Sequence, residues 1–344
     1  MDKKYTIKDI AELAGVSKGT VDRVLHQRGK VSSKSLEQVQ KVLKEIDYQP
    51  NPIARNLKNN KVYKICILMP DPEQDAYWYP AVQGIRNATN EFKPFGLSVS
   101  KFYYDPYNRD SFIEKSQKAL KSPLDALLIV PLFQKEAQDI YKQCQEKKVL
   151  VASFNNTIDT FNPGNFIGQD LYQSGRVAAS LIEKLVDEKA IIGILHLDEE
   201  ANMKLREKGF KSYFEKKTNP PKISTFSLRT SDREAFKKEA VALVESNSKI
   251  SAIFVTNSKA YHFIQAIDHL CKDITIVGYD LLDENINFLK TGCIDFLIHQ
   301  KPKRQAYLGV GYLAEHFLFG KPIPSENLLP IDIITSENVA YYLD

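Results

Sequence analysis

The chain has 344 residues, a formal net charge of +4 and 43% hydrophobic residues. This length exceeds one typical hydrophobic core and predicts two or three domains. No apolar run is long enough to cross a bilayer, and the N-terminus lacks the apolar core of a signal peptide. We therefore expect a cytoplasmic protein with no membrane partner. A bacterial source fits, because no organelle signal is visible.

The charge is unevenly distributed along the chain. Residues 1–61 carry 13 Lys and Arg against 7 Asp and Glu, whereas residues 62–344 carry 34 against 36. Only the N-terminal part therefore has the electrostatic character of a protein that binds a polyanion such as DNA.

The four cysteines are widely spaced and form no CxxC pair. They are Cys66, Cys144, Cys271 and Cys293. Such spacing predicts reduced thiols that act as small apolar residues, and it argues against a disulfide framework or a zinc site.

Two helical patterns joined by a glycine open the chain. Thr6 and Asp9 have capping-box spacing, and apolar residues between positions 7 and 14 then recur at the spacing of one helical stripe. Gly15 permits a tight turn, and Ser17 can cap a second helix whose apolar residues face the first. This pattern predicts a helix-turn-helix, in which the second helix enters the major groove of DNA.

A third helical pattern over residues 31–46 completes a small core. Two prolines then mark a boundary, and the Asn51–Pro52 pair suits the start of a short helix over residues 53–57. A helix this short needs a partner to hold it. We expect a DNA-binding domain at 1–50, a hinge helix and linker at 51–61, and a large body at 62–344.

From residue 64 onward, short apolar segments alternate with amphipathic ones. Strands are expected at 65–69, 97–102, 126–130, 149–154, 191–197, 223–226, 252–255, 274–278 and 296–298. Helices are expected near 80–92, 110–121, 134–147, 172–186, 203–216, 233–246, 259–270 and 303–319. Apolar strands separated by helices are typical of parallel sheets covered on both faces, the doubly wound α/β class. Two successive series predict two similar lobes with a ligand cleft at the carboxyl ends of their strands.

Several of these segments resemble the lactose/galactose repressor (LacI/GalR) family. They are TIKDIAELAGVS, TVDRVL and YQPNPIARNL in residues 6–57, and IVGYD and IHQxxxxxxYLG in the body. The resemblance covers the whole chain and implies a homodimeric transcription regulator, a repressor, whose affinity for DNA is set by a small molecule.

The resemblance also implies a body like a type I periplasmic binding protein, in which the chain crosses three times between two lobes. The first lobe is then expected at 62–162 plus 299–323, and the second at 163–298 plus 324–344.

The recognition helix offers hydroxyl and cationic side chains for DNA contact. Ser17 and Thr20 suit phosphate oxygens, whereas Lys18 and Arg23 could read guanine. Gly19 has no side chain, which predicts a slack position in the operator. The predicted DNA-binding set is Thr6, Ser17, Lys18, Gly19, Thr20, Asp22, Arg23, His26, Asn51, Ala54, Arg55 and Leu57.

Two members of this set carry specific expectations. Asp22 either pairs with Lys18 one turn earlier, accepts from a cytosine N4, or is a solvated carboxylate that weakens binding. Leu57, by the resemblance, wedges into the minor groove while Ala54 allows close approach; the alternative is a leucine packed against the body.

The ligand site is expected at the ends of several strands. Aromatic residues 77–79 could stack on a sugar or a base, or could close a loop over the core. A few placed donors and acceptors suit a hydroxyl-rich ligand, a sugar or sugar derivative. The predicted set is Tyr77, Trp78, Tyr79, Asn155, Asn156, Lys204, Asn257, Asp280 and Gln300. The family carries an acid–Arg pair at 155–156 and an Arg at Lys204, so Lys204 could meet a carboxylate or phosphate on the effector.

No catalytic motif stands out, and we expect neither an enzyme, a cofactor nor a metal site. Gly309 to Ala314 match a dinucleotide-binding pattern, but they lie inside a helical run. The alternatives are a ligand-binding protein without regulatory DNA binding, and, more remotely, a sugar-modifying enzyme. The effector, the operator and the sign of the response stay open.

Overall fold

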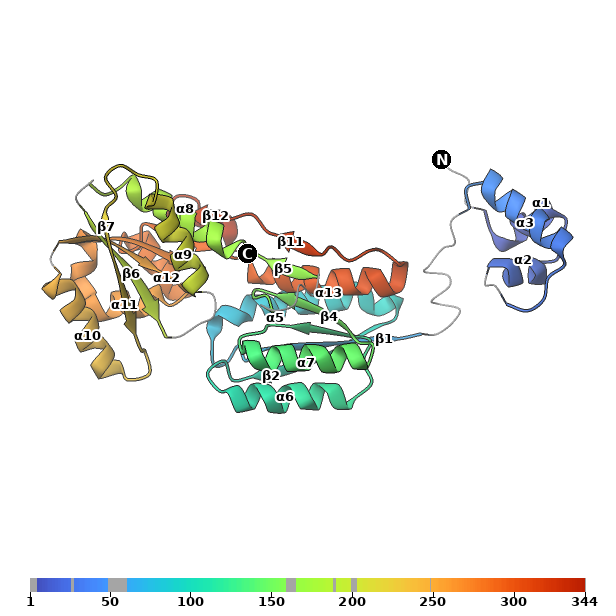
Figure 1. The fold of residues 1–344 in the computed structure, drawn as a ribbon, viewed down its shortest axis with the longest axis horizontal. Coiled ribbons are helices and arrows are strands. Elements are labelled where there is room, and N and C mark those ends of the chain that lie inside the picture. Colours follow the sequence, from blue (N-terminus) through green and yellow to red (C-terminus); the bar gives the residue numbers. More distant parts are fainter. Residues whose placement is uncertain are drawn as a thin grey trace. The chain divides into compact units, whose positions relative to one another are not determined.

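The computed structural model describes residues 5–25, 28–48, 61–158, 165–187, 190–198, 203–247 and 249–343. The chain divides into two compact units, Met1–Lys61 and Val62–Asp344 (Figure 1). None of the helices in the described ranges is both long and apolar enough to span a membrane.

The first unit is a bundle of short helices, α1 (Ile7–Ala14), α2 (Lys18–Leu25) and α3 (Ser33–Glu45). The Thr6–Asp9 capping box forms as predicted, and Gly15 ends α1 with a left-handed φ of 63°. Ile10, Val21 and Val39, one from each helix, are fully buried together. The helix-turn-helix is therefore confirmed, and its small core comes from the predicted apolar stripes.

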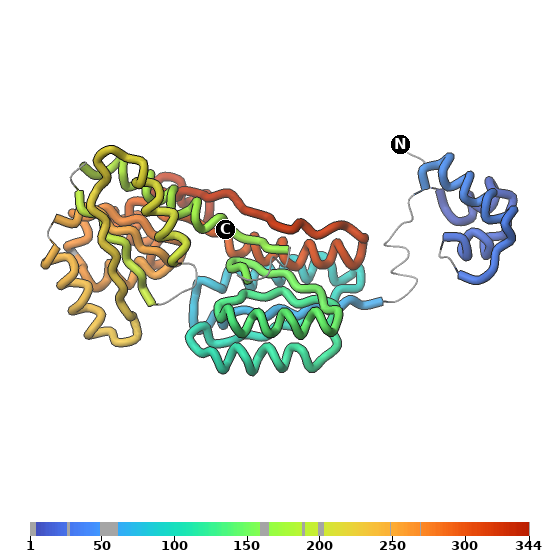
Figure 2. Tube along the Cα trace, in the orientation of Figure 1, coloured from blue at the N-terminus to red at the C-terminus, as the bar shows by residue number. Residues whose placement is uncertain are grey.

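The first lobe of the second unit is built on a parallel six-stranded sheet with the order β11-β5-β4-β3-β1-β2. Its strands are β1 (Tyr63–Pro70), β2 (Leu97–Tyr104), β3 (Ala126–Ile129), β4 (Leu150–Phe154), β5 (Phe166–Gly168) and β11 (Glu326–Leu328). Helices α5 (Tyr79–Phe92) and α13 (Pro302–Phe319) pack on one face, and α6 (Arg109–Lys121) and α7 (Gln134–Glu146) on the other. Figure 2 shows the red α13 beside the light-blue α5, although they are far apart in sequence.

The second lobe repeats this plan with the strand order β12-β10-β9-β8-β6-β7, in which only the β10–β12 pair is antiparallel. Its strands are β6 (Ile191–Leu197), β7 (Lys222–Leu228), β8 (Ile250–Val255), β9 (Thr275–Tyr279), β10 (Phe296–His299) and β12 (Asp332–Ile334). Helices α8 (Leu171–Glu183) and α9 (Met203–Phe214) cover one face; α10 (Arg233–Ser246), α11 (Ala260–Ile267) and α12 (Asp283–Thr291) cover the other. The doubly wound, two-lobed fold is therefore confirmed.

The lobe boundaries differ from the predicted ones. β5 and β11 pair with each other in the sheet of the first lobe, although residues from 163 and from 324 were expected in the second. The chain consequently crosses between lobes after Gly168, after His299 and between Leu328 and Asp332. Each of these strands has only three residues, which is too short for a periodic pattern to reveal.

Glycines allow the helix pairs to approach closely in both lobes. A Cβ added to Gly175 of α8 would lie 2.0 Å from the carbonyl oxygen of Arg206 in α9, and one on Gly209 would lie 1.9 Å from that of Tyr172. In the first lobe, a Cβ on Gly84 of α5 would lie 2.0 Å from the carbonyl oxygen of Lys303. Any side chain at these positions would push the paired backbones apart.

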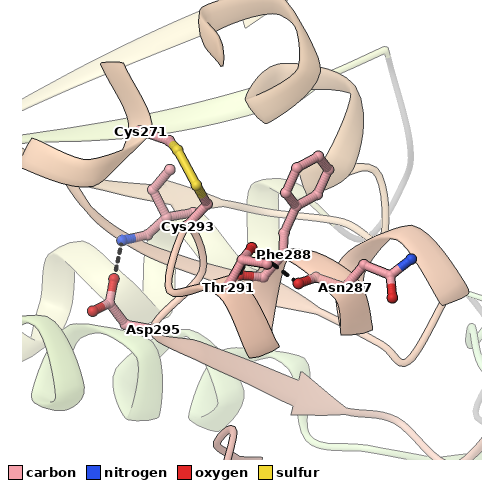
Figure 3. The surroundings of a disulfide bond; sticks show 7 residues. Cys271, Asn287, Phe288, Thr291, Cys293 and Asp295 are labelled. Carbon is pink, nitrogen blue, oxygen red and sulfur yellow. Dashed lines mark hydrogen bonds between the residues drawn. A yellow bond between two sulfur atoms is a disulfide. The ribbon is translucent and has the colours of Figure 1, made fainter. Parts of the chain in front are cut away.

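The expectation of four reduced cysteines is wrong for one pair. Cys271 and Cys293 form a disulfide, whereas Cys66 and Cys144 are free and buried. Cys271 lies in the 3-10 helix η3 (Asp268–Asp273), and Cys293 follows α12, so that helix packing brings their Cα atoms within 5.3 Å (Figure 3). A sequence separation of 22 residues and the absence of a CxxC motif gave no local signal for this pairing.

Candidate functional site

A cavity of about 90 Å³ lies between the two lobes, where the carboxyl ends of strands from both sheets meet. Its lining comes from loops after β1, β2, β3, β4, β8 and β10, and from α9. The lining residues are Asp75, Tyr77, Trp78, Pro106, Tyr107, Leu132, Phe133, Asn155, Asn156, Arg206, Asn257, Ser258 and Gln300. This is where parallel α/β sheets bind ligands.

Arg206 is the buried cation of this cavity. Its side chain donates from Nη1 to the Thr256 carbonyl and from Nη2 to Gln300 Oε1, both at 2.6 Å, and only 2% of the residue is exposed. The guanidinium also stacks 4.0 Å from the ring centre of Tyr279. Its Nε has no hydrogen-bond partner among the described residues. Arg206 is thus held in place and keeps donor capacity for a ligand.

Asp280 supports the cavity from behind. Its carboxylate accepts from Gln300 N at 2.9 Å and from Gln300 Nε2 at 2.5 Å, and Asp280 is 1% exposed. Gln300 in turn presents its Oε1 to Arg206. Asp280 does not line the cavity itself; it fixes the amide that orients the guanidinium.

The first lobe contributes an aromatic and amide wall. Tyr77 and Trp78 lie in the 3-10 helix η1 (Ala76–Trp78), and their rings meet edge to face. Asn155 Nδ2 donates to the Tyr77 hydroxyl at 2.6 Å. Burial raises the pKa of Tyr77 well above its ordinary value, so this hydroxyl stays protonated and can also donate.

A contact between the lobes lies at the rim of the cavity. Lys259 Nζ of the second lobe sits 4.9 Å from the ring centre of Tyr107, which belongs to the first lobe. The same ammonium donates to Asp198 Oδ2 at 2.7 Å, and Thr230 donates to that carboxylate from its backbone and its hydroxyl. Burial opposes ionisation of Asp198, but these hydrogen bonds outweigh it and lower the pKa of its carboxyl.

A second polar network lies beneath Arg206. His196 bonds to Thr256 Oγ1 through Nδ1 and to Glu207 Oε2 through Nε2, both at 2.8 Å. Lys211 and Thr225 also donate to Glu207. Burial opposes ionisation of Glu207, but these donors outweigh it and lower its pKa to about 2. The network fixes Thr256, whose carbonyl holds Arg206.

Six of the nine residues predicted for the ligand site line the cavity: Tyr77, Trp78, Asn155, Asn156, Asn257 and Gln300. Asp280 supports it from behind, as described above. Tyr79 begins α5 and is 50% exposed, and Lys204 is exposed on α9; neither lines the cavity.

The cavity cation missed by sequence reasoning lies two residues beyond Lys204. Met203, Arg206 and Phe210 share a buried helical stripe, with spacings of three and four residues. An arginine on an apolar stripe is a sign that its charge is used internally. Tyr107 and Phe133, also missed, lie in loops with no periodic pattern.

The exposed face of α2 carries the predicted DNA-binding side chains. Lys18, Gly19 and Arg23 are exposed, and the hydroxyls of Ser17 and Thr20 are 3.0 Å apart. Ser17 Oγ also accepts from Thr20 N, so it caps the helix as expected. Thr6 is used in the capping box, and the role of Asp22 stays a prediction. The remaining predicted residues lie outside the described ranges: His26, Asn51, Ala54, Arg55 and Leu57.

Within the parts of the chain that the structure describes, no group of three or more His, Cys, Asp or Glu side chains is placed to hold a metal ion.

Two family models match the chain in separate regions. Residues 65–322 match the periplasmic binding protein domain, and residues 6–51 match the bacterial regulatory proteins of the lacI family. The two matches correspond to the two compact units.

Similar proteins cover between about half and nearly all of the chain. The sucrose operon repressor of Streptococcus mutans is 22% identical over 97% of this chain and 99% of its own length. The catabolite repressor/activator of Escherichia coli is 24% identical over 73% of each chain. The HTH-type transcriptional regulator MalR of Streptococcus pneumoniae is 29% identical over 55% of this chain and 56% of its own length.

Solved structures agree with the two-lobed body. A LacI transcriptional regulator from Bacteroides fragilis superposes with a TM-score of 0.77 and 26% identity, covering 82% of this chain and all of that one. GanP, a glucose-galactose binding protein from Geobacillus stearothermophilus, shares the fold with a TM-score of 0.72 at 19% identity, over 81% of this chain and 99% of its own. The chain therefore belongs to the periplasmic binding protein domain family over residues 65–322, and a helix-turn-helix domain of the lacI family of bacterial regulatory proteins precedes this at residues 6–51.

Proposed function

We propose that this protein is a cytoplasmic transcriptional regulator that binds a palindromic operator as a homodimer. Its affinity for the operator rises or falls when a sugar or sugar derivative fills the cavity between the lobes. The observation that carries the proposal is the buried Arg206–Gln300–Asp280 arrangement in a cavity lined by both lobes. A ligand that contacts both lobes changes their relative pose, and this links the effector to DNA affinity.

The DNA half of the proposal rests on the exposed face of α2. Ser17 and Thr20 would position the helix on phosphates, and Lys18 and Arg23 would read base edges. Two-fold symmetry of the dimer would match two half-sites in the operator. Positively charged residues 1–61 supply the electrostatic attraction.

The effector half rests on the chemistry of the lining. Aromatic faces at Tyr77, Trp78 and Tyr107 suit the apolar face of a sugar ring, and the amides of Asn155 and Asn257 suit its hydroxyls. Two of the relatives have names that refer to a sucrose operon and to catabolite control. We therefore propose a carbohydrate effector, neutral or acidic.

The test has two parts. Full-length protein is used to select binding sites from a random duplex library, and we expect an inverted repeat bound with a steep dependence on salt. A panel of sugars, sugar phosphates, sugar acids and nucleosides is then screened by thermal shift, since a ligand that binds only the folded state raises the melting temperature. Every hit is added to the operator titration. If no DNA sequence is enriched in the selection, the alternative holds, a ligand-binding protein without regulatory DNA binding.

The predicted hinge residue Leu57 has its own test. Leu57→Ala should strongly reduce operator affinity, because an apolar wedge between bases would be lost, and it should leave effector affinity unchanged. Equal operator binding by variant and parent would show that Leu57 is an ordinary packing residue.

A further inference from the structure

The three segments that connect the lobes are tied together by one side chain. Gln169 stands in the first of them, between β5 and α8, and only 2% of it is exposed. Its Nε2 donates to the carbonyl of His299, at the end of β10, at 3.0 Å. It also donates to the carbonyl of Pro330, between β11 and β12, at 3.1 Å. One amide thus bonds to both of the other crossings.

Other contacts bring the crossings together in pairs. Leu329 N donates to the Gly168 carbonyl at 2.7 Å, which joins the third crossing to the first. Lys301 Nζ and Asp332 Oδ2 form an ion pair at 2.7 Å, which joins the second to the third. The side chain of Gln169, in the first crossing, hydrogen-bonds to the second crossing at His299 and to the third at Pro330.

The Gln169 amide is also connected to the cavity, because its partner His299 directly precedes the lining residue Gln300. Gln169 holds the carbonyl of His299, and the next residue, Gln300, orients Arg206. Asp280 fixes both the backbone and the side chain of Gln300. A short bonded path therefore runs from the centre of the crossings to the cation of the cavity.

We propose that Gln169 is a positioning residue that makes the three crossings bend as one hinge and so sets the range of relative poses the two lobes can adopt. Bending one crossing alone would pull the amide away from at least one of its two carbonyls. Both hydrogen bonds persist only when the three segments rotate together, which favours rigid-body movement of the lobes over independent fraying. Among the described residues, the Gln169 side chain donates to the backbone carbonyls of His299 and Pro330, and it acts through these two segments.

The experiment measures the distance between the lobes in the full chain without any effector. Lys121→Cys at the end of α6 and Lys237→Cys in α10 place one spin label on an exposed site of each lobe. Cys66 and Cys144 are buried and the other two cysteines are bonded to each other, so labelling is directed to the introduced thiols. Pulsed electron–electron double resonance then gives the distribution of distances between the two spin labels, one on each lobe.

Three variants are compared in this labelled background. Gln169→Leu removes both N–H donors of the amide and keeps a side chain of similar size. Gln169→Asn keeps an amide on a side chain that is too short to reach both carbonyls. Gln134→Leu is the matched control, because Gln134 Nε2 also donates to two backbone carbonyls, those of Pro131 and Thr157, which both belong to the first lobe.

We expect the Gln169 variants to have an interlobe distribution about twice as wide as that of the parent. The Gln134 variant should lose thermal stability and keep the parent distribution. A parent-like distribution in Gln169→Asn or Gln169→Leu, alongside a lowered melting temperature, would overturn the proposal and leave Gln169 a structural residue. The measurement contains no ligand and no DNA, so its outcome is independent of the function proposed above.

Discussion

Lys259 and Tyr107 meet across the mouth of the cavity, the ammonium of one lobe 4.9 Å from the centre of an aromatic ring of the other. Lys259 is buried and anchored to Asp198, whereas Tyr107 is 58% exposed. The second lobe therefore offers an anchored cation to an exposed ring of the first lobe. This contact favours the pose in which the lobes enclose the cavity.

Replacing the ring should weaken effector binding modestly. Tyr107→Ala removes a cation–π contact worth about 0.5–1 kcal/mol, so we expect effector affinity to fall roughly two- to fivefold. Tyr107→Phe keeps the aromatic face and should bind like the parent. Titration calorimetry with the strongest hit of the ligand panel measures both variants, and equal losses in the two would assign the effect to the hydroxyl instead.

Removing the buried cation should have a larger effect. Arg206→Met takes away charged hydrogen-bond donors worth about 1.5–3 kcal/mol each, which predicts about tenfold to hundredfold weaker effector binding. Lys204→Met is the control on the same helix, because Lys204 is exposed and should bind the effector like the parent. Calorimetry on the folded variants decides, and a loss confined to Lys204→Met would reverse our assignment of the two residues.

Glu207 should make the protein sensitive to acid. Its pKa is lowered from 4.5 to about 2 in the folded state, so the folded protein holds the carboxylate more firmly charged than the unfolded chain does. The resulting stability is present above pH 4.5 and is lost as the pH falls toward 2. In Glu207→Gln, we expect a flatter fall in unfolding free energy over this window, measured by urea titration at several pH values. A variant with the same slope as the parent would contradict this account.

The disulfide should contribute to the stability of the second lobe. Closing a loop between residues 22 apart restricts the unfolded chain, which corresponds to about 3 kcal/mol at 25 °C. Cys271→Ser with Cys293→Ser, or reduction of the parent, should lower the unfolding free energy by about this amount. Peptide mapping without reductant verifies the bond. Equal stability of reduced and oxidised protein would show that the two thiols serve only as packing.

Much of the fold could be predicted because its signals are local. The cap at Thr6, the turn at Gly15 and the alternation of apolar strands with helices all lie within short windows of sequence. The strands β5 and β11 could not be predicted, because three residues show no period and their pairing joins positions about 160 residues apart.

The site was predictable to the extent that it follows strand ends. Asn155, Asn257 and Gln300 each come after a strand and reach the cavity. Arg206 comes from the first turn of α9, and its place depends on the close packing of α9 against α8. The resemblance drew attention to Lys204, whereas the residue of α9 that lines the cavity is Arg206.

The glycine contact between α8 and α9 has a consequence for how this receptor can diversify. Because Gly175 faces the Arg206 backbone with no space for a Cβ, the helix axis is locked independently of what the side chain at 206 does. The side chain at position 206 can therefore change during evolution, and the ligand preference with it, without any shift of α9 against α8. The packed pair of helices thus keeps its backbone geometry while ligand specificity changes.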